Sequence, residues 1–146
     1  MKLNVRRSFT TVNPPGVVFA YLADFRNAET WDPGTVSCAL LSGDVGVGAT
    51  YRNTSEFLGR EAVLTYTTLT HEPSQRLHFQ GVNDSFVGDD RLTFAPEGPG
   101  TRVGYHATFE LKGASALAVP VVAAYLPFLA SKTIKQLQAT LDRLTV

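Results

Sequence analysis

The C-terminal segment from Ala114 to Thr145 combines the length of a long helix with a helical period of apolar residues. At 1.5 Å per residue, a helix of this length extends over roughly 45 Å. Its second half carries one apolar stripe, made of Ile134, Leu137, Leu141 and Leu144. Its first half, up to Ala130, has no charged residue, so we expect it to be covered on most sides. Such a helix needs a partner layer, and the strand-rich sequence before it predicts a sheet.

The uncharged stretch from Gly113 to Ser131 also has nearly the length of a membrane span. Pro120 and Pro127 interrupt it, and an amphipathic helix continues from it, which a span does not require. We therefore interpret it as a buried helix and expect no transmembrane segment. Residues 1–7 lack the apolar core of a signal peptide.

Size, charge and cysteine content narrow the possible domain organisation, partners and compartment of the protein. A chain of 146 residues has the size of one domain, so residues 1–146 are expected to form a single domain. Thirteen basic and thirteen acidic residues cancel, which gives the whole chain no charge footprint for nucleic acid or an anionic membrane. The single cysteine, Cys38, cannot form an internal disulfide, which fits a reducing compartment and predicts a cytoplasmic protein.

The chain before the long helix is typical of one strand, two short helices and six further strands. Residues 3–12 alternate apolar and polar side chains, as in a strand. Asn13-Pro14-Pro15 predicts a helix start with Asn13 as its cap, and residues 24–32 predict a second short helix or turn. The later strand-like runs are 35–41, 49–58, 60–70, 75–81, 85–94 and 101–111. Their short connections favour an antiparallel meander.

This order of elements predicts an α+β fold in which a curved seven-stranded antiparallel sheet wraps around the C-terminal helix. The two short helices lie between strands 1 and 2. Because a strongly twisted sheet cannot lie flat against one helix, we expect a cavity between the two.

Several residues carry a resemblance to a known superfamily. They are Phe9, Pro14, Pro15, Val18, Phe19, Leu22, Asp24, Phe25, Asn27, Glu29, Trp31, Asp32, Pro33, Gly48, Tyr51 and Gly113. In this spacing the chain resembles the SRPBCC superfamily, also called START-like or polyketide cyclase/dehydrase-like, which has the helix-grip fold. The resemblance implies binding of lipids, polyketides, plant hormones or other apolar molecules, and in some members cyclase or dehydratase activity.

The alternation of side chains along each strand predicts which residues face the cavity. Polar side chains on that face are informative, because burying one without a partner costs on the order of 1–3 kcal/mol. We predict ligand-binding roles for Trp31, Tyr51, Asn53, Tyr66, Leu77, Phe79, Asp90, Leu92, Tyr105, Val122 and Leu126. The alternative is that the polar groups bond one another and the helix fills the space.

Asp90, with Tyr66 or Tyr105, is the candidate catalytic set, because a tuned carboxyl moves protons and a phenol polarises a carbonyl group. Arg7 lies on the inward parity of its strand, so it either pairs with Asp90 or extends to solvent. We favour solvent.

No metal or cofactor is expected. The three histidines, His71, His78 and His106, lack ligand spacing, so the iron site of oxygenase-like relatives is not predicted. Cys38 is expected to be buried and unreactive. The glycine-rich residues 43–48 join two strands rather than opening a helix, which indicates a flexible loop and not a phosphate site.

Three hypotheses of function remain open. The leading one is binding of a small hydrophobic molecule, such as a lipid or polyketide, in the cavity. The second is a metal-independent polyketide cyclase/dehydratase, and the absence of a clear acid–base pair in the sequence weighs against an enzyme. The third is an interaction module without a ligand. A homodimer through the uncharged helix segment is also left open.

Overall fold

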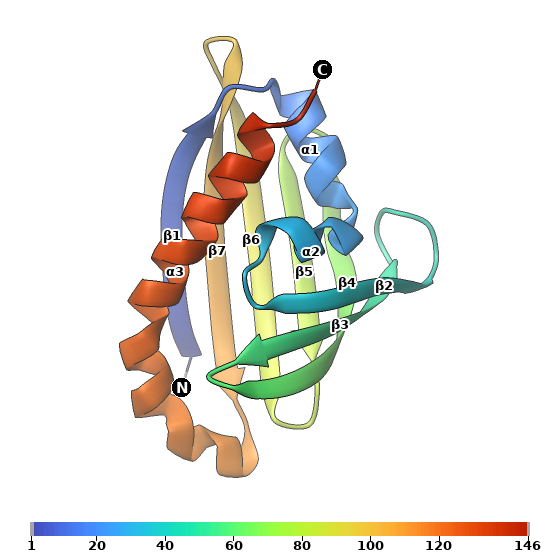
Figure 1. The fold of residues 1–146 in the computed structure, drawn as a ribbon. Coiled ribbons are helices and arrows are strands. Elements are labelled where there is room, and N and C mark those ends of the chain that lie inside the picture. Colours follow the sequence, from blue (N-terminus) through green and yellow to red (C-terminus); the bar gives the residue numbers. More distant parts are fainter. Residues whose placement is uncertain (1, 146) are drawn as a thin grey trace.

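The computed structural model describes residues 2–145 and shows a sheet that curves around a long C-terminal helix (Figure 1). The strands are β1 (Lys2–Thr11), β2 (Thr35–Ser42), β3 (Thr50–Phe57), β4 (Arg60–Glu72), β5 (Arg76–Val82), β6 (Phe86–Glu97) and β7 (Gly100–Leu111). The helices are α1 (Pro15–Ala23), η1 (Phe25–Asn27), α2 (Ala28–Trp31), η2 (Gly113–Ala118) and α3 (Val119–Asp142), where η denotes a 3₁₀ helix.

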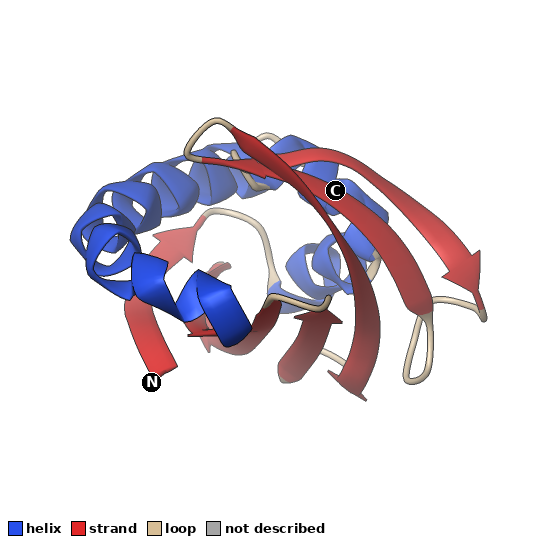
Figure 2. Cartoon of the chain, turned by 90° about the horizontal axis from the view of Figure 1, so that it is seen from below, coloured by secondary structure: helices blue, strands red, loops and turns tan. Residues whose placement is uncertain are grey.

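All neighbouring strands are antiparallel, in the order β1-β7-β6-β5-β4-β3-β2. The strands β2 to β7 form the predicted meander, and β1 closes it by pairing with β7 along its whole length. In Figure 1, β2 and β3 cross in front of β5 to β7, and Figure 2 shows the helices on the inner side of the curve. The predicted α+β fold, with two short helices after the first strand, is therefore confirmed.

Register shifts and glycines accompany the curvature. The ladder shifts by one residue between Thr68 and Thr70 in β4, and twice along β2. Such bulges bend a strand and increase its twist. Gly81 and Gly88 pair with each other across β5 and β6. A side chain at Gly81 would overlap the ring of Tyr66, so this ring lies over bare backbone.

The upper part of the concave face holds the closed core. Val18, Leu22 and Phe25, which come from α1 and the start of η1, are at most 1% exposed. On α3, Leu137 and Leu141 are fully buried and Ile134 is partly buried. Leu144, just beyond the end of α3 at Asp142, is partly buried against the same core. The apolar stripe predicted for the second half of this helix is confirmed.

The first half of the C-terminal segment is less covered than the sequence indicated. Of residues 113–131, only Val122, Leu126 and Ala130 are buried. These three are spaced by four residues, so they form the one narrow stripe that faces the protein. The expectation of cover on most sides was wrong, because the absence of charge describes the polarity of a segment and not its neighbours.

Asn13 does not cap the helix that follows it. Helix α1 begins after Pro14 and has no side-chain cap. The Asn13 amide instead donates to the carbonyl oxygens of Leu141 (2.8 Å) and Leu144 (3.1 Å), at the other end of the chain. The prediction of a local cap was wrong because the last carbonyls of a helix lack the usual partners within it. Those at the end of α3 accept the Asn13 side chain in a buried position instead.

Candidate ligand-binding site

Asp90 and Tyr105 form a hydrogen-bonded pair on the concave face. Asp90 lies in the middle of β6, and the strand parity that buries Leu92 directs it inward as well. Tyr105 of β7 is in register with Leu92, one inward position away, and its hydroxyl donates to Asp90 Oδ1 over 2.8 Å. The two residues are 9% and 7% exposed. A carboxyl group and a phenol are thus held together at a largely apolar surface.

Burial raises the pKa of Asp90 from its ordinary 3.8 to about 7. The hydrogen bond from Tyr105 acts in the opposite direction, and the charges of Asp32 and Asp89 add to the increase. Burial, and next the charge of Asp90, raises the pKa of Tyr66 and Tyr105 well above the ordinary value. Near neutral pH the site therefore holds a carboxyl that exchanges a proton readily and two neutral hydroxyl groups.

The rows of residues across the sheet define the surroundings of this pair. Phe79 and Ala107 flank Asp90 in register, and Thr68 continues the row on β4. In the next row, Tyr66 is in register with Gly81. Gly81 and Gly88 have no side chains, so the sheet presents bare backbone beside the carboxyl group, and the ring of Tyr66 covers it at Gly81.

Aromatic rings fill the space on the other side of the pair. The ring of Phe25 lies 4.5 Å from that of Tyr66 and 4.6 Å from that of Phe79, between ring centres. Trp31 packs edge-on against Phe25 (6.3 Å) and Tyr105 (6.4 Å). The predicted site residues at most 1% exposed are Trp31, Tyr51, Asn53, Leu77, Phe79 and Leu92. These residues form the closed end of the concave face.

Three buried polar atoms in this region have no hydrogen-bond partner within residues 2–145. They are the indole nitrogen of Trp31 and the hydroxyls of Tyr51 and Thr68. Asn53 differs, because its amide donates to Thr35 Oγ1 (3.1 Å) and accepts from the hydroxyl of Ser55. Unpartnered buried polar atoms are costly, whereas the amide of Asn53 already has partners and joins β2 to β3.

The other end of the concave face is apolar and half-buried. Tyr66, Phe86, Phe109 and Leu111 contribute from the sheet, and Tyr125 and Leu129 contribute from α3. The rings of Phe57 and Tyr125 meet edge-on, with centres 5.4 Å apart, and join the end of β3 to the first half of α3. Val122 and Leu126 lie on the protein-facing stripe of the same half-helix. Phe57, Phe86, Phe109 and Tyr125 were not predicted, although inward parity already marks Phe86 and Phe109.

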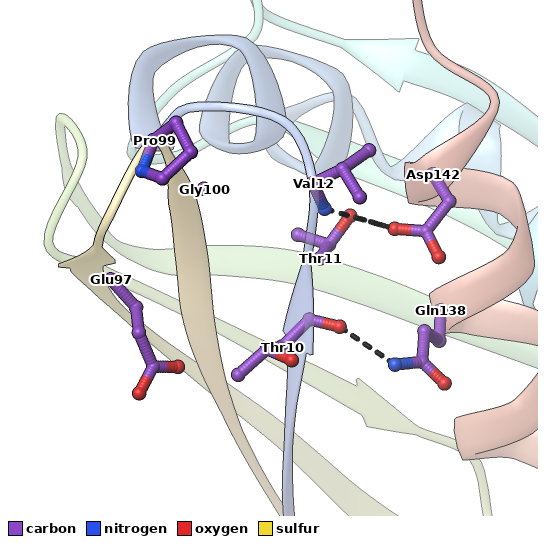
Figure 3. A pocket seen from close by; sticks show the side chains of 8 residues that line it. All are labelled: Thr10, Thr11, Val12, Glu97, Pro99, Gly100, Gln138 and Asp142. Carbon is purple, nitrogen blue, oxygen red and sulfur yellow. Dashed lines mark hydrogen bonds between the residues drawn. The ribbon is translucent and has the colours of Figure 1, made fainter.

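The two most prominent surface hollows described by the structure lie elsewhere. One, of about 590 Å³, lies between the end of β1, the β6–β7 turn and the C-terminal end of α3 (Figure 3). Its side chains already bond one another: the Thr11 hydroxyl and Val12 amide donate to Asp142, and Gln138 donates to the carbonyl of Thr10. These hydrogen bonds fix the C-terminal end of α3 to the end of β1. The other, of about 420 Å³, is lined by Arg6, Arg7, Ser8, Arg91, Thr93, Gly104, Tyr105 and His106 and opens on the convex face.

Arg7 extends to solvent, as favoured from the sequence. It is exposed, and its guanidinium donates to the carbonyl of Arg6 (2.9 Å) rather than to Asp90. Its inward parity does not bury it, although Val5 and Phe9 on the same parity of β1 are buried, because the long side chain carries its charge out to water.

His78 and Cys38 take no part in the hydrogen bond of the pair. His78 is on the convex side, where its ring contacts Asp89 Oδ1 (2.7 Å). Within residues 2–145, no group of three or more His, Cys, Asp or Glu side chains is arranged to hold a metal ion. Cys38 is 5% exposed, and burial raises its pKa to about 11, which confirms a buried thiol of low reactivity.

The curved sheet around a long helix is the helix-grip fold and agrees with the sequence resemblance to the START-like SRPBCC superfamily. Residues 2–145 match the family described as polyketide cyclase / dehydrase and lipid transport, and the chain belongs to that family. Among curated proteins, none matches this sequence.

Solved structures show the same fold at low sequence identity. An aromatase/cyclase from Streptomyces sp. R1128 is similar with a TM-score of 0.82 and 13% identity, over 98% of this chain and 95% of that one. A START superfamily protein from Mycobacterium smegmatis has a TM-score of 0.80 and 18% identity, over 97% and 99%. A protein from Thermus thermophilus has a TM-score of 0.78 and 20% identity, over 95% and 97%.

Proposed function

We propose that this protein binds a small, mostly apolar molecule on the concave face, between the sheet and the first half of α3. The observation that carries the proposal is the buried Asp90–Tyr105 pair between a closed aromatic end and a half-buried apolar end of that face. A ligand site of this type is mainly apolar with a few fixed polar groups. Membership in a family of cyclases, dehydrases and lipid transporters supports it.

The polar groups suggest how such a ligand is oriented. A carbonyl or hydroxyl group that reaches the closed end meets the Trp31 and Thr68 donors, which have no partner within the protein's described residues. The ring of Tyr105 packs against that of Trp31, and Asp90 lies in the same row as Thr68 with Phe79 between them. The apolar body of the ligand lies against Tyr66, Val122 and Leu126. Among the residues predicted from the sequence, those of the closed end set the polar anchor and those of α3 set the apolar fit.

Native mass spectrometry of the purified protein, followed by organic extraction, tests the proposal. We expect a mass increment that is lost on extraction and a compound with one or two polar groups on an apolar body. If no compound is retained, titration with apolar fluorescent dyes and fatty acids follows. Failure of all of these to bind the folded protein contradicts the proposal and favours an interaction module whose core is filled.

A second candidate function is a cyclase or dehydratase reaction, and the pKa of about 7 at Asp90 favours it. A carboxyl with this pKa can accept a proton from an activated carbon near neutral pH, while a neutral Tyr66 or Tyr105 hydroxyl polarises a carbonyl oxygen. The Asp90→Asn variant separates the two functions. In an enzyme, turnover of a poly-β-keto substrate is lost while ligand affinity changes little; in a carrier, no turnover is found in either form.

A further inference from the structure

The first half of the C-terminal helix has an outer face that is both apolar and exposed. Leu117 of η2 is 87% exposed, and Val121 and Phe128 of α3 are 59% and 79% exposed. We call Leu117, Val121 and Phe128 the apolar helix face. By length and composition, Gly113–Asp142 is apolar enough to cross a membrane, but its second half is packed in the core of the fold. Large exposed apolar patches of this kind mark surfaces that meet a partner.

Helical geometry separates this face from the stripe that packs on the protein. At about 100° per residue, Val121 and Phe128 lie within about 20° of each other. Lys132 follows Phe128 by four residues on the same exposed side, and Lys135 lies nearby. Val122 and Leu126 point toward the protein. The outer side of α3 therefore passes from apolar to cationic along its length.

The charged residues of this segment are all positive. Between Glu110 and Asp142 the only charged residues are Lys112, Lys132 and Lys135, although the whole chain has no net charge. An apolar face flanked by lysines matches the interfacial region of an anionic bilayer, where apolar side chains enter the acyl boundary and lysines remain among the headgroups.

We propose that the apolar helix face docks this protein on the surface of an anionic lipid bilayer. The segment lies on the membrane rather than across it, because Val122, Leu126 and Ala130 remain packed against the protein. A second copy of the chain fits less well. A two-fold dimer through this face places like-charged lysines of both copies around one interface, and the segment has no acidic residue to pair with them.

The Phe57–Tyr125 contact gives the docking surface a position relative to the concave face. Tyr125 lies on α3 between Val121 and Phe128 in sequence, and its ring meets that of Phe57 at the half-buried end of the sheet. Docking through the apolar helix face brings this end close to the bilayer. The proposal does not depend on ligand binding, since the face and its lysines are independent of Asp90.

Co-sedimentation of the full chain with lipid vesicles tests the proposal. One set of vesicles contains phosphatidylcholine alone, and the other has part of it replaced by phosphatidylserine. We expect binding to the anionic vesicles that weakens in high salt, and much weaker binding to the neutral ones. The double variant Leu117→Ser/Phe128→Ser should lose at least about tenfold in affinity. Lys132→Gln and Lys135→Gln should each lose about fivefold.

Matched controls are available on β2 and β3, outside the C-terminal helix segment. Val36 is 55% exposed on β2, and Arg52 is exposed on β3, so Val36→Ser and Arg52→Gln should bind vesicles as the original protein does. Binding that is absent, or that survives the loss of Leu117 and Phe128, overturns the proposal. It is equally overturned if native mass spectrometry shows a dimer that the double variant abolishes while no vesicle is bound, which assigns the face to a second copy.

Discussion

Asp90 occupies a position that disfavours its charge. In the unfolded chain an aspartate releases its proton near pH 3.8, whereas in the fold burial raises the pKa to about 7. The folded state therefore binds more protons than the unfolded state between these values, and the contribution of Asp90 to stability falls as pH rises through this window. A carboxyl group kept at such a cost is typical of functional sites.

The Asp90→Asn variant should be more stable than the original protein at pH 8, by on the order of 2–4 kcal/mol. Asparagine has no charge to bury, and its amide oxygen still accepts the Tyr105 hydroxyl. Urea unfolding from pH 4 to 8 measures the effect. The original protein should lose stability over this range, while the variant should show a flatter profile.

Asp32 limits how flat that profile becomes, because burial also raises its pKa and the variant retains it. Asp32→Asn, made separately, serves as the control and should remove its own part of the slope together with the smaller increase that its charge causes at Asp90. Identical pH profiles for the original protein and Asp90→Asn would show that Asp90 is not buried as described.

At the level of elements, the two halves of α3 have different supports. Its C-terminal end is held by Asn13, and by Gln138 and Asp142, which bond residues of β1 and its end. Its first half touches the protein through one stripe and through the Tyr125–Phe57 contact. Stability within a fold follows such differences, so the first half is the part expected to open most easily.

Asn13→Ala should destabilise the protein by about 1–3 kcal/mol. The substitution removes both hydrogen bonds to the end of α3 and leaves the buried carbonyl of Leu141 with only the longer bond from the Leu144 amide (3.3 Å). Gln136→Ala is a suitable control, because Gln136 also donates to a carbonyl, that of Thr30, but in an exposed position (2.9 Å). Urea denaturation should give less than about 1 kcal/mol for the control. Equal losses of stability in the two variants would mean that the burial of the Asn13 hydrogen bonds does not add to their contribution.

Pro127 lies inside α3 and removes one backbone hydrogen bond. In Figure 1 the lower, orange part of the helix and its upper, red part run in different directions. We expect Pro127→Ala to restore the bond, straighten the helix, bring its first half closer to the sheet and stabilise the fold by about 1–3 kcal/mol. A crystal structure of the variant measures the bend and the space above the sheet. An unchanged bend would assign the curvature to packing instead.

For the whole molecule, the open question is whether the half-buried end of the concave face admits a ligand. Ala62 of β4 pairs with Ser55 at that end and is half-buried. Ala62→Trp should occupy the space with a loss of stability below about 1 kcal/mol and should reduce uptake of an apolar dye at least tenfold.

The matched variant Ala95→Trp places the same ring on the exposed, convex side of β6 and should bind the dye normally. Thermal unfolding and dye titration check both proteins. If Ala62→Trp instead unfolds more easily by about 1–3 kcal/mol, as an overpacked core does, the concave face is filled and the binding proposal fails.

The local rules of strand geometry predicted much of the site. Period-two parity correctly directed Tyr66, Asp90 and Tyr105 inward, since alternation is a property of the strand itself. The same rule was insufficient for Arg7, because a long charged side chain can reach solvent from an inward position whose apolar neighbours Val5 and Phe9 are buried. The net charge of the whole chain likewise gave no indication that the charged residues within 111–141 are all lysines.

By itself, then, the sequence determined the elements, their order and the faces of the strands, because turn residues and apolar periods act over a few residues. Only the tertiary structure decided the partners. It brought the Tyr105 hydroxyl of β7 to Asp90 of the neighbouring strand β6, turned Asn13 toward the C-terminal end of α3, and left Phe128 exposed on the uncharged first half of that helix. Each outcome depends on which surfaces meet when distant segments pack, and no local pattern along the chain contains that information.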